Sequence, residues 1–117
     1  MNRQILLTLN LPEDSILLNE GILEALDWPR QVQILINPEE KKLLLRACAL
    51  DDIQAVVVPE KRVEQFEISG RSFLRKIRQL VGWEDNQPRM CVGEYLPSHQ
   101  AVLFDLSSAR ILDMELV

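Results

Sequence analysis

The chain carries the stretch SILLNEGILEALDWPRQVQILINPEEKKLLLR at residues 15–46, and a looser version of it returns at residues 70–105. The centre of the second version is SFLRKIRQLVGW, which is followed by PRMCVGEYLPSHQAVLFD. When the first version is shifted by 55 positions, Trp28 falls on Trp83, and the apolar residues of the two helical stretches align. Because these are the chain's two tryptophans, their coincidence indicates an internal repeat.

Each copy combines two kinds of apolar pattern. Alternation of apolar and polar residues predicts half-buried strands, and apolar residues three or four positions apart predict an amphipathic helix. In the first copy, the predicted strands are residues 4–11, 15–18, 31–37 and 42–48, and the predicted helix is residues 21–26. Asn19 is a suitable N-cap for this helix, and Pro29 is expected to end it.

The second copy has the same order with a longer and more basic helix. Its predicted strands are residues 55–58, 63–68, 89–95 and 101–106. Its helix presents one apolar stripe at helical spacing, formed by Phe73, Leu74, Ile77, Leu80 and Val81. We expect Ser69 or Ser72 to cap the start of this helix and Gly82 to end it.

We expect two halves that form one compact domain, because a unit of a few short strands and one short helix cannot cover its own apolar face and sheet edges. The halves are residues 1–49 and 55–106, joined by a linker at 50–54 and followed by a tail at 107–117. Hairpins from both halves are expected to interleave. The alternative is a single α+β domain whose halves resemble each other by chance.

The composition indicates an acidic globular protein. Hydrophobic residues make up 47% of the chain and charged residues 26%, and the net charge is −5. Residues 1–58 hold 5 basic and 9 acidic groups, while residues 59–117 hold 8 and 9, so most basic groups lie in the second half. An acidic chain is a poor candidate for non-specific nucleic-acid binding, because phosphate neutralisation supplies most of that affinity. A local basic face is still able to bind DNA.

No segment indicates a membrane or secreted protein. The apolar run at residues 5–9 is too short for a signal sequence, and no run approaches the roughly 18 residues that span a bilayer. Cys48 and Cys91 occupy non-equivalent places in the two copies, which favours reduced thiols and a cytoplasmic location. We therefore expect no membrane partner.

No pattern indicates an enzyme, a metal site or a cofactor site. His99 has no cysteine or carboxylate at ligand spacing, and no motif presents His99 or its neighbour Ser98 for nucleophilic catalysis. The acidic pairs at residues 39–40 and 51–52 lie in predicted turns rather than as an acid and base pair. The 4 glycines are scattered singly, so there is no phosphate-binding loop. We expect no catalytic residue, no metal and no cofactor.

The repeated unit resembles the AbrB/MazE/SpoVT group of swapped-hairpin barrels, which are bacterial DNA-binding regulators and antitoxins. The resemblance lies in LLNEGILEALDW followed by QVQILINPEEKKLLLR, and in FLRKIRQLVGW followed by PRMCVGEYLPSHQAVLFD. It implies a mainly β fold with two short helices, in which a pseudo-two-fold swapped-hairpin β-barrel forms within one chain. It also implies a transcriptional regulator that binds double-stranded DNA, as a monomeric pseudo-dimer or a homodimer.

The candidate DNA-binding residues share the second helix: Arg71, Arg75, Lys76 and Arg78. The three arginines have helical spacing on the side away from the apolar stripe, and an arginine fork suits bidentate contact with phosphate. The alternative interpretation is a solvated helix face whose arginines pair with acidic neighbours, namely Glu64, Glu67 or Asp85.

A second hypothesis is a protein-interaction module, in which the barrel no longer binds DNA and docks a protein partner instead. The acidic charge of the chain favours this hypothesis, as does the first-copy helix, which has Leu23 and Glu24 where the family has paired arginines. The tail favours it too, because Leu112, Met114 and Leu116 alternate and are suited to add a strand to a sheet. The tail also fits a helical turn capped by Ser108.

Overall fold

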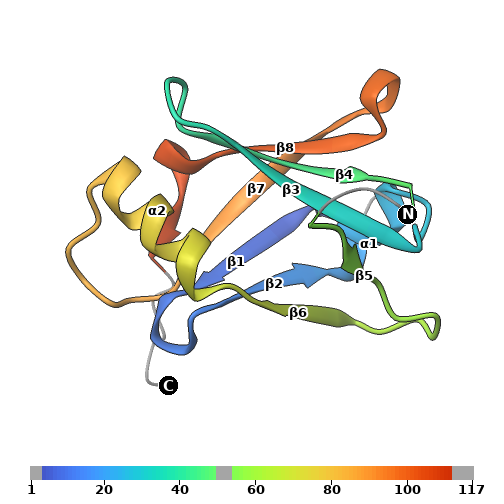
Figure 1. Ribbon diagram of the computed structural model, residues 1–117, viewed down its shortest axis with the longest axis horizontal. Helices are drawn as coiled ribbons and strands as arrows, with labels where there is room; N and C mark the ends of the chain where they lie inside the picture. The colour runs from blue at the N-terminus through green and yellow to red at the C-terminus, as the bar shows by residue number, and fades with distance from the viewer. Residues whose placement is uncertain (1–3, 50–53, 112–117) are drawn as a thin grey trace.

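The computed structural model describes residues 4–49 and 54–111, and its strands form one antiparallel sheet that curls into a nearly closed barrel (Figure 1). The mainly β architecture with two α-helices agrees with the fold class expected from the sequence. The strands of the first half are β1 (Leu6–Asn10), β2 (Ser15–Asn19), β3 (Gln31–Asn37) and β4 (Lys42–Ala47). Those of the second half and the tail are β5 (Val56–Val57), β6 (Gln65–Ser69), β7 (Arg89–Leu96), β8 (Ala101–Asp105) and β9 (Arg110–Ile111).

Strands from the two halves are mixed around the barrel. Hydrogen-bonded neighbours follow the order β5-β3-β4-β8-β7-β1-β2-β6, and β9 pairs with β7. Strands of different halves meet in four of these pairings, namely β1 with β7, β2 with β6, β3 with β5, and β4 with β8. Hairpin β3–β4 therefore lies between two strands of the second half, and hairpin β1–β2 does as well.

Helix α1 (Glu20–Ala25) begins at Asn19, as its sequence predicts. Asn19 Oδ1 accepts hydrogen bonds from the backbone N–H of Ile22 at 3.1 Å and of Leu6 at 3.2 Å. Asn19 Nδ2 donates to the backbone oxygen of Gln4 at 2.8 Å, so one side chain joins the start of α1 to the N-terminal strand. The helix ends before it reaches Pro29, because the chain turns through left-handed conformations at the two preceding residues.

Helix α2 (Arg71–Val81) begins at Gly70, and the prediction of a serine cap is wrong. Ser69 is held in β6 opposite Ser15, so its side chain does not cap the helix. Gly70 is closely packed: a Cβ atom at this position would lie 2.1 Å from the ring of Phe73, so the ring would have to move. The predicted end is confirmed, because Gly82 adopts a left-handed φ of 83° and its N–H donates to the oxygen of Arg78.

The two helices lie at opposite sides of the barrel and close its core (Figure 1). Each helix contributes two fully or almost fully buried aliphatic side chains, Ile22 and Leu23 from α1 and Leu74 and Ile77 from α2. The strands of both halves supply the rest of the interior, including Leu7, Leu9, Ile16, Leu18, Leu43, Leu45, Val102 and Phe104. One apolar core is therefore built from both copies of the repeat.

The tail begins with a 3₁₀ turn (Leu106–Ser108) and then pairs as β9 with the start of β7. Ser108 lies at the end of this turn and donates to the oxygen of Asp105, whose side chain caps the turn instead. The predicted alternation at residues 112–116 and most of the predicted linker lie outside the described residues. No described helix combines the length and apolar character needed to cross a bilayer.

Candidate functional site

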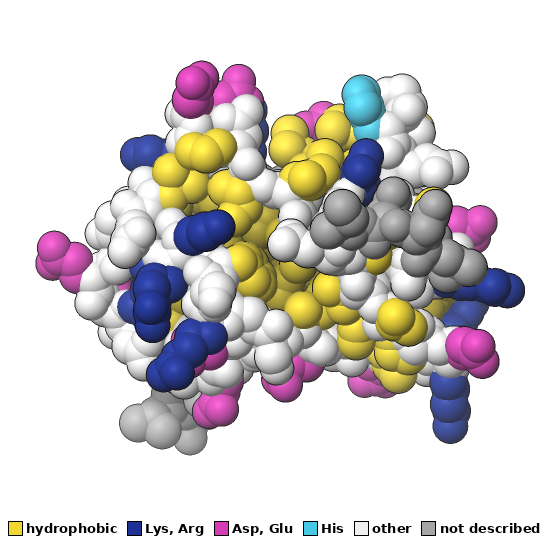
Figure 2. All heavy atoms as spheres, in the orientation of Figure 1, with side chains coloured by type: hydrophobic (Ala, Val, Ile, Leu, Met, Phe, Trp, Pro, Cys, Tyr) yellow, Lys and Arg dark blue, Asp and Glu magenta, His cyan; other side chains and the backbone are white. Residues whose placement is uncertain are grey.

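The four predicted site residues separate onto two sides of α2. Arg71, Arg75 and Arg78 line a shallow pocket of about 220 Å³ together with Asp14. Lys76 lines a larger groove on the side that faces β3. Figure 2 shows both features on one face: basic side chains gather over α2, beside a hollow in which apolar side chains are visible.

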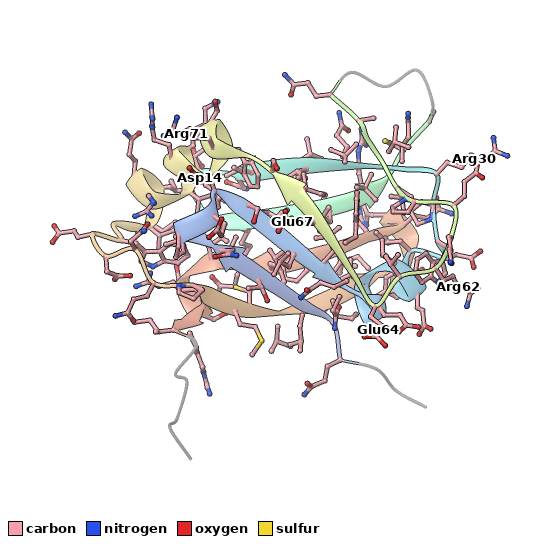
Figure 3. All side chains as sticks on the ribbon, turned by 90° about the horizontal axis from the view of Figure 1, so that it is seen from below. Asp14, Arg30, Arg62, Glu64, Glu67 and Arg71 are labelled. Atoms are coloured by element: carbon pink, nitrogen blue, oxygen red, sulfur yellow. The ribbon has the colours of Figure 1, made fainter. Side chains whose placement is uncertain are left out.

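Arg71 pairs with an acidic residue that the sequence did not suggest. Its Nε lies 3.5 Å from Asp14 Oδ2, and the two side chains are 77% and 44% exposed. The backbone N–H of Gly70 donates to the backbone oxygen of Asp14 at 2.8 Å. This hydrogen bond holds the turn before β2 against the start of α2, and so brings the two side chains together. Figure 3 shows Glu64, one predicted partner, at the opposite end of β6. An ion pair this exposed contributes little to stability.

Arg78 holds the loop that follows α2. Its guanidinium donates to the backbone oxygen of Asp85 at 2.7 Å and to the side-chain oxygen of Asn86. Asp85 is one of the predicted acidic partners, but Arg78 binds its backbone carbonyl and not its carboxylate. Since this arginine already has a structural role, the basic side of α2 offers mainly Arg71 and Arg75 to a ligand.

The carboxylate of Asp85 binds Arg89, a residue that the sequence analysis did not single out. Two hydrogen bonds of 2.8 Å join Arg89 to the two oxygens of Asp85, and the Arg89 side chain is 8% exposed. Hydrogen bonds from Arg89, and then from the backbone N–H of Gln87, hold the pKa of Asp85 well below its usual range. The two residues lie in the loop after α2 and at the start of β7, not on one helix, so no local pattern in the sequence predicts this pair.

Both tryptophans have an arginine above their ring. The guanidinium of Arg89 lies 4.4 Å from the centre of Trp83, and that of Arg62 lies 5.2 Å from the centre of Trp28. Both rings also pack against the common core. These contacts are of the cation–π type and assign the tryptophans to the framework of the barrel.

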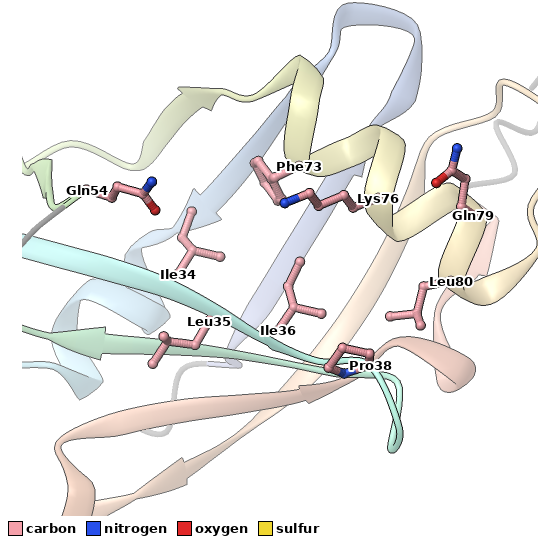
Figure 4. Close-up of a pocket in the computed structure, with 9 residues that line it drawn as sticks. All are labelled: Ile34, Leu35, Ile36, Pro38, Gln54, Phe73, Lys76, Gln79 and Leu80. Atoms are coloured by element: carbon pink, nitrogen blue, oxygen red, sulfur yellow. The ribbon is translucent and has the colours of Figure 1, made fainter.

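The larger groove lies between α2 and β3 and has a volume of about 730 Å³ (Figure 4). Its lining residues are Ile34, Leu35, Ile36, Pro38, Gln54, Phe73, Lys76, Gln79 and Leu80. In the close-up, the isoleucines of β3 lie opposite Phe73 and Leu80, and the Lys76 side chain extends from α2 toward Phe73. The sequence analysis missed this groove, because it assigned Phe73 and Leu80 only to the core-facing stripe.

Among the described residues, the other reactive side chains lie apart from one another. Cys91 is buried, its thiol donates to the oxygen of Asp105 at 3.2 Å, and burial raises its pKa to about 11. Ser98 and His99 contact each other at 3.0 Å in an exposed turn. Among residues 4–49 and 54–111, no group of three or more potential ligands is placed to hold a metal ion.

No protein-family model, curated protein or solved structure matches the chain. The two surfaces of α2 are therefore the basis for inferring a function. One is a small basic side with a carboxylate in it, and the other is an apolar groove with one lysine at its mouth.

Proposed function

We propose that the chain is a protein-interaction module whose groove between α2 and β3 binds a segment of another protein. The groove itself carries the proposal. Its volume of about 730 Å³ is within the range of roughly 300–1,000 Å³ that is usual for ligand sites, and apolar residues dominate its lining. Contiguous apolar surface that remains open to solvent is typical of interaction sites.

We also propose that the module is a swapped-hairpin barrel of the kind that the sequence resembles, with both halves in one chain. The strand order supports this. A two-fold relation between the halves would match β1, β2, β3 and β4 with β5, β6, β7 and β8. Under this relation the β1–β7 pair corresponds to the β5–β3 pair, and the β4–β8 and β2–β6 pairs each correspond to themselves. The pairing register of hairpin β3–β4 matches that of hairpin β7–β8 when 59 is added to each residue number. The same offset takes Leu44 to Leu103, and these two residues are paired between β4 and β8.

DNA binding is the second candidate function, supported by the three arginines that share one side of α2. It ranks below protein binding because Asp14 neutralises part of this side, Arg78 holds a loop, and the chain carries a net charge of −5. A titration against mixed DNA fragments at low and physiological salt tests it. Replacing Arg71 and Arg75 by alanine should then lower the salt slope by about one unit for each lost phosphate contact.

A random peptide library selected on the full-length protein tests the proposed function. Gln79→Trp adds bulk to the groove from an exposed position of α2, and Ser72→Trp is the matched control at an exposed position that does not line the groove. Enriched peptides should bind the wild type and Ser72→Trp and lose binding to Gln79→Trp. Peptides that bind both variants equally, or no enrichment at all, would contradict the proposal.

A further inference from the structure

Three leucines form a row on the outer surface of the barrel. The backbone register pairs Leu35 of β3 with Leu44 of β4, and Leu44 with Leu103 of β8. Leu35 is 39% exposed, and the other two are partly exposed. Side chains alternate along a strand, so the row points away from the core, because the residues on either side of Leu44 and Leu103 are fully buried: Leu43, Leu45, Val102 and Phe104.

The row interrupts a polar surface. An antiparallel sheet that faces solvent carries polar residues at its outward positions. The outward positions beside the row follow this rule, with Gln33 and Asn37 on β3, Lys42 and Arg46 on β4, and Asp105 on β8. Figure 2 shows apolar side chains gathered between the two hairpin tips that Figure 1 places at the top of the molecule. A contiguous apolar patch with a polar rim is typical of an interaction site.

A shallow depression of about 240 Å³ lies at the same place. Its lining comes from β3, β4, the turn between them and β8, namely Leu35, Ile36, Asn37, Glu40, Lys42, Leu44 and Leu103. Among the described residues, no helix contributes to this lining. The face is therefore a hollowed sheet surface, into which apolar side chains of a facing sheet can pack.

The charges beside the row suit a second copy of the same face. Lys42 is paired in register with Asp105, on one side of the leucines. Consider a second copy turned about an axis that runs parallel to β4 and β8, midway between them. Lys42 of each copy then faces Asp105 of the other, and Leu44 faces Leu103. A turn about the axis along the leucine row would instead bring Lys42 opposite Arg46, so the charges favour the first arrangement.

We propose that two copies of the chain associate face to face through the outer surface of β3, β4 and β8, with the leucine row at the centre. A two-fold interface uses one patch twice, so the patch has to complement itself in both apolar character and charge. The leucines meet the first condition, and Lys42 with Asp105 meets the second. The association is separate from the proposed function, because Leu44 and Leu103 do not line the groove beside α2.

Sedimentation velocity of the full-length protein tests the leucine row. An interface of a few strands is small, so the wild type should change from monomer to dimer over about 5–500 µM. Leu44→Gln and Leu103→Gln should each weaken dimerisation about tenfold or more, because each removes an apolar side chain from the centre of the interface. Val57→Gln is the matched control, since it removes an apolar side chain that is 67% exposed on β5, and should dimerise as the wild type does.

Exchanging the charges tests the arrangement of the two copies. Lys42→Glu places acidic groups opposite each other across the two-fold axis, and Asp105→Lys places basic groups there, so each variant alone should dimerise about tenfold more weakly at low salt. An equimolar mixture of the two variants should form a heterodimer, because each acidic side chain then faces a lysine. The charges within each chain remain alike in the mixture, so recovery reports contacts between chains.

Arg75→Glu and Glu67→Lys are the matched charge controls, at exposed positions outside this face, and should dimerise as the wild type does. Thermal unfolding checks that every variant is folded, which matters for Asp105→Lys because the Asp105 side chain accepts a hydrogen bond from the N–H of Ser107. A wild type that stays monomeric throughout would overturn the inference. A mixture that stays monomeric although the wild type dimerises would overturn it too, as would dimerisation that Gln79→Trp abolishes and the leucine variants keep.

Discussion

The two helices occupy equivalent places in the repeat, and the structure uses them differently. Helix α1 has 6 residues and buries Gly21, Ile22 and Leu23, and its cap also holds the N-terminal strand. Helix α2 has 11 residues but buries only Leu74 and Ile77. Its remaining surface consists of the arginine side and the groove side.

The difference shows which positions of the repeat serve the core. Each helix places two aliphatic side chains in the barrel, but of these only Ile22 and Ile77 coincide when the copies are shifted by 55 positions. Helix α2 also lines the groove with β3, through Phe73, Lys76, Gln79 and Leu80. The proposed binding function therefore rests on α2, whereas the buried side chains of α1 serve the core.

The largest expected effect is on the side chains that each helix buries in the core. Leu23→Ala and Leu74→Ala each remove a side chain that is at most 1% exposed, and each should lower the free energy of unfolding by about 2–5 kcal/mol. Urea unfolding at neutral pH measures both. Similar losses would confirm that both helices close one core, whereas a loss below about 1 kcal/mol for Leu74→Ala would mean that α2 is only loosely attached.

The second expected effect is specific to the start of α1. Asn19→Ala removes the cap and the hydrogen bonds to Leu6 and Gln4, and should cost about 1–2 kcal/mol in thermal or urea unfolding. Helix α2 has no side-chain cap to lose. Ser72→Ala, in its first turn, is the control and should change stability by less than about 0.5 kcal/mol. Equal losses in the two variants would contradict the assignment of Asn19.

The third prediction concerns the loop after α2, in which the carboxylate of Asp85 has a lowered pKa. The folded state lowers the pKa of Asp85 through hydrogen bonds from Arg89. Its stabilising contribution is therefore present above about pH 4, the usual aspartate value, and is lost as the pH falls through the lowered folded-state value. Asp85→Asn should remove this part of the acid dependence of unfolding measured between about pH 5 and pH 2.

An exposed carboxylate serves as the control for this pH profile. Glu94→Gln removes one negative charge from an exposed residue of β7 and is the matched charge control. If Asp85→Asn has the same acid slope as Glu94→Gln, the Arg89 pair does not stabilise the fold in the way that its geometry indicates.

The smallest expected effect is on the outer side of α2. Arg71→Ala and Arg75→Ala change exposed positions, and each should alter the free energy of unfolding by less than about 0.5 kcal/mol. Thermal unfolding at low and high salt checks this. A larger loss at either position would assign that arginine to the framework, as for Arg78, and would remove it from the candidate DNA-binding side.

Several predictions that rest on short-range sequence patterns were confirmed. The strand predicted at residues 31–37 matches β3, Asn19 caps α1, and Gly82 ends α2. Alternation, capping and left-handed turns depend on neighbours within a few residues, so a single sequence carries them. The serine cap failed because Ser69 pairs with Ser15 at the end of β6, a contact between distant segments that local preference does not reveal.

The candidate site depended on contacts between distant segments. The sequence placed four basic residues on one helix, but the approach of β3 assigned Lys76 to an apolar groove, and the turn before β2 brought Asp14 to Arg71. The groove exists because α2 lies beside β3. Local periodicity specifies where strands and helices form, whereas strand order and the surfaces between elements follow from long-range packing of the shared core.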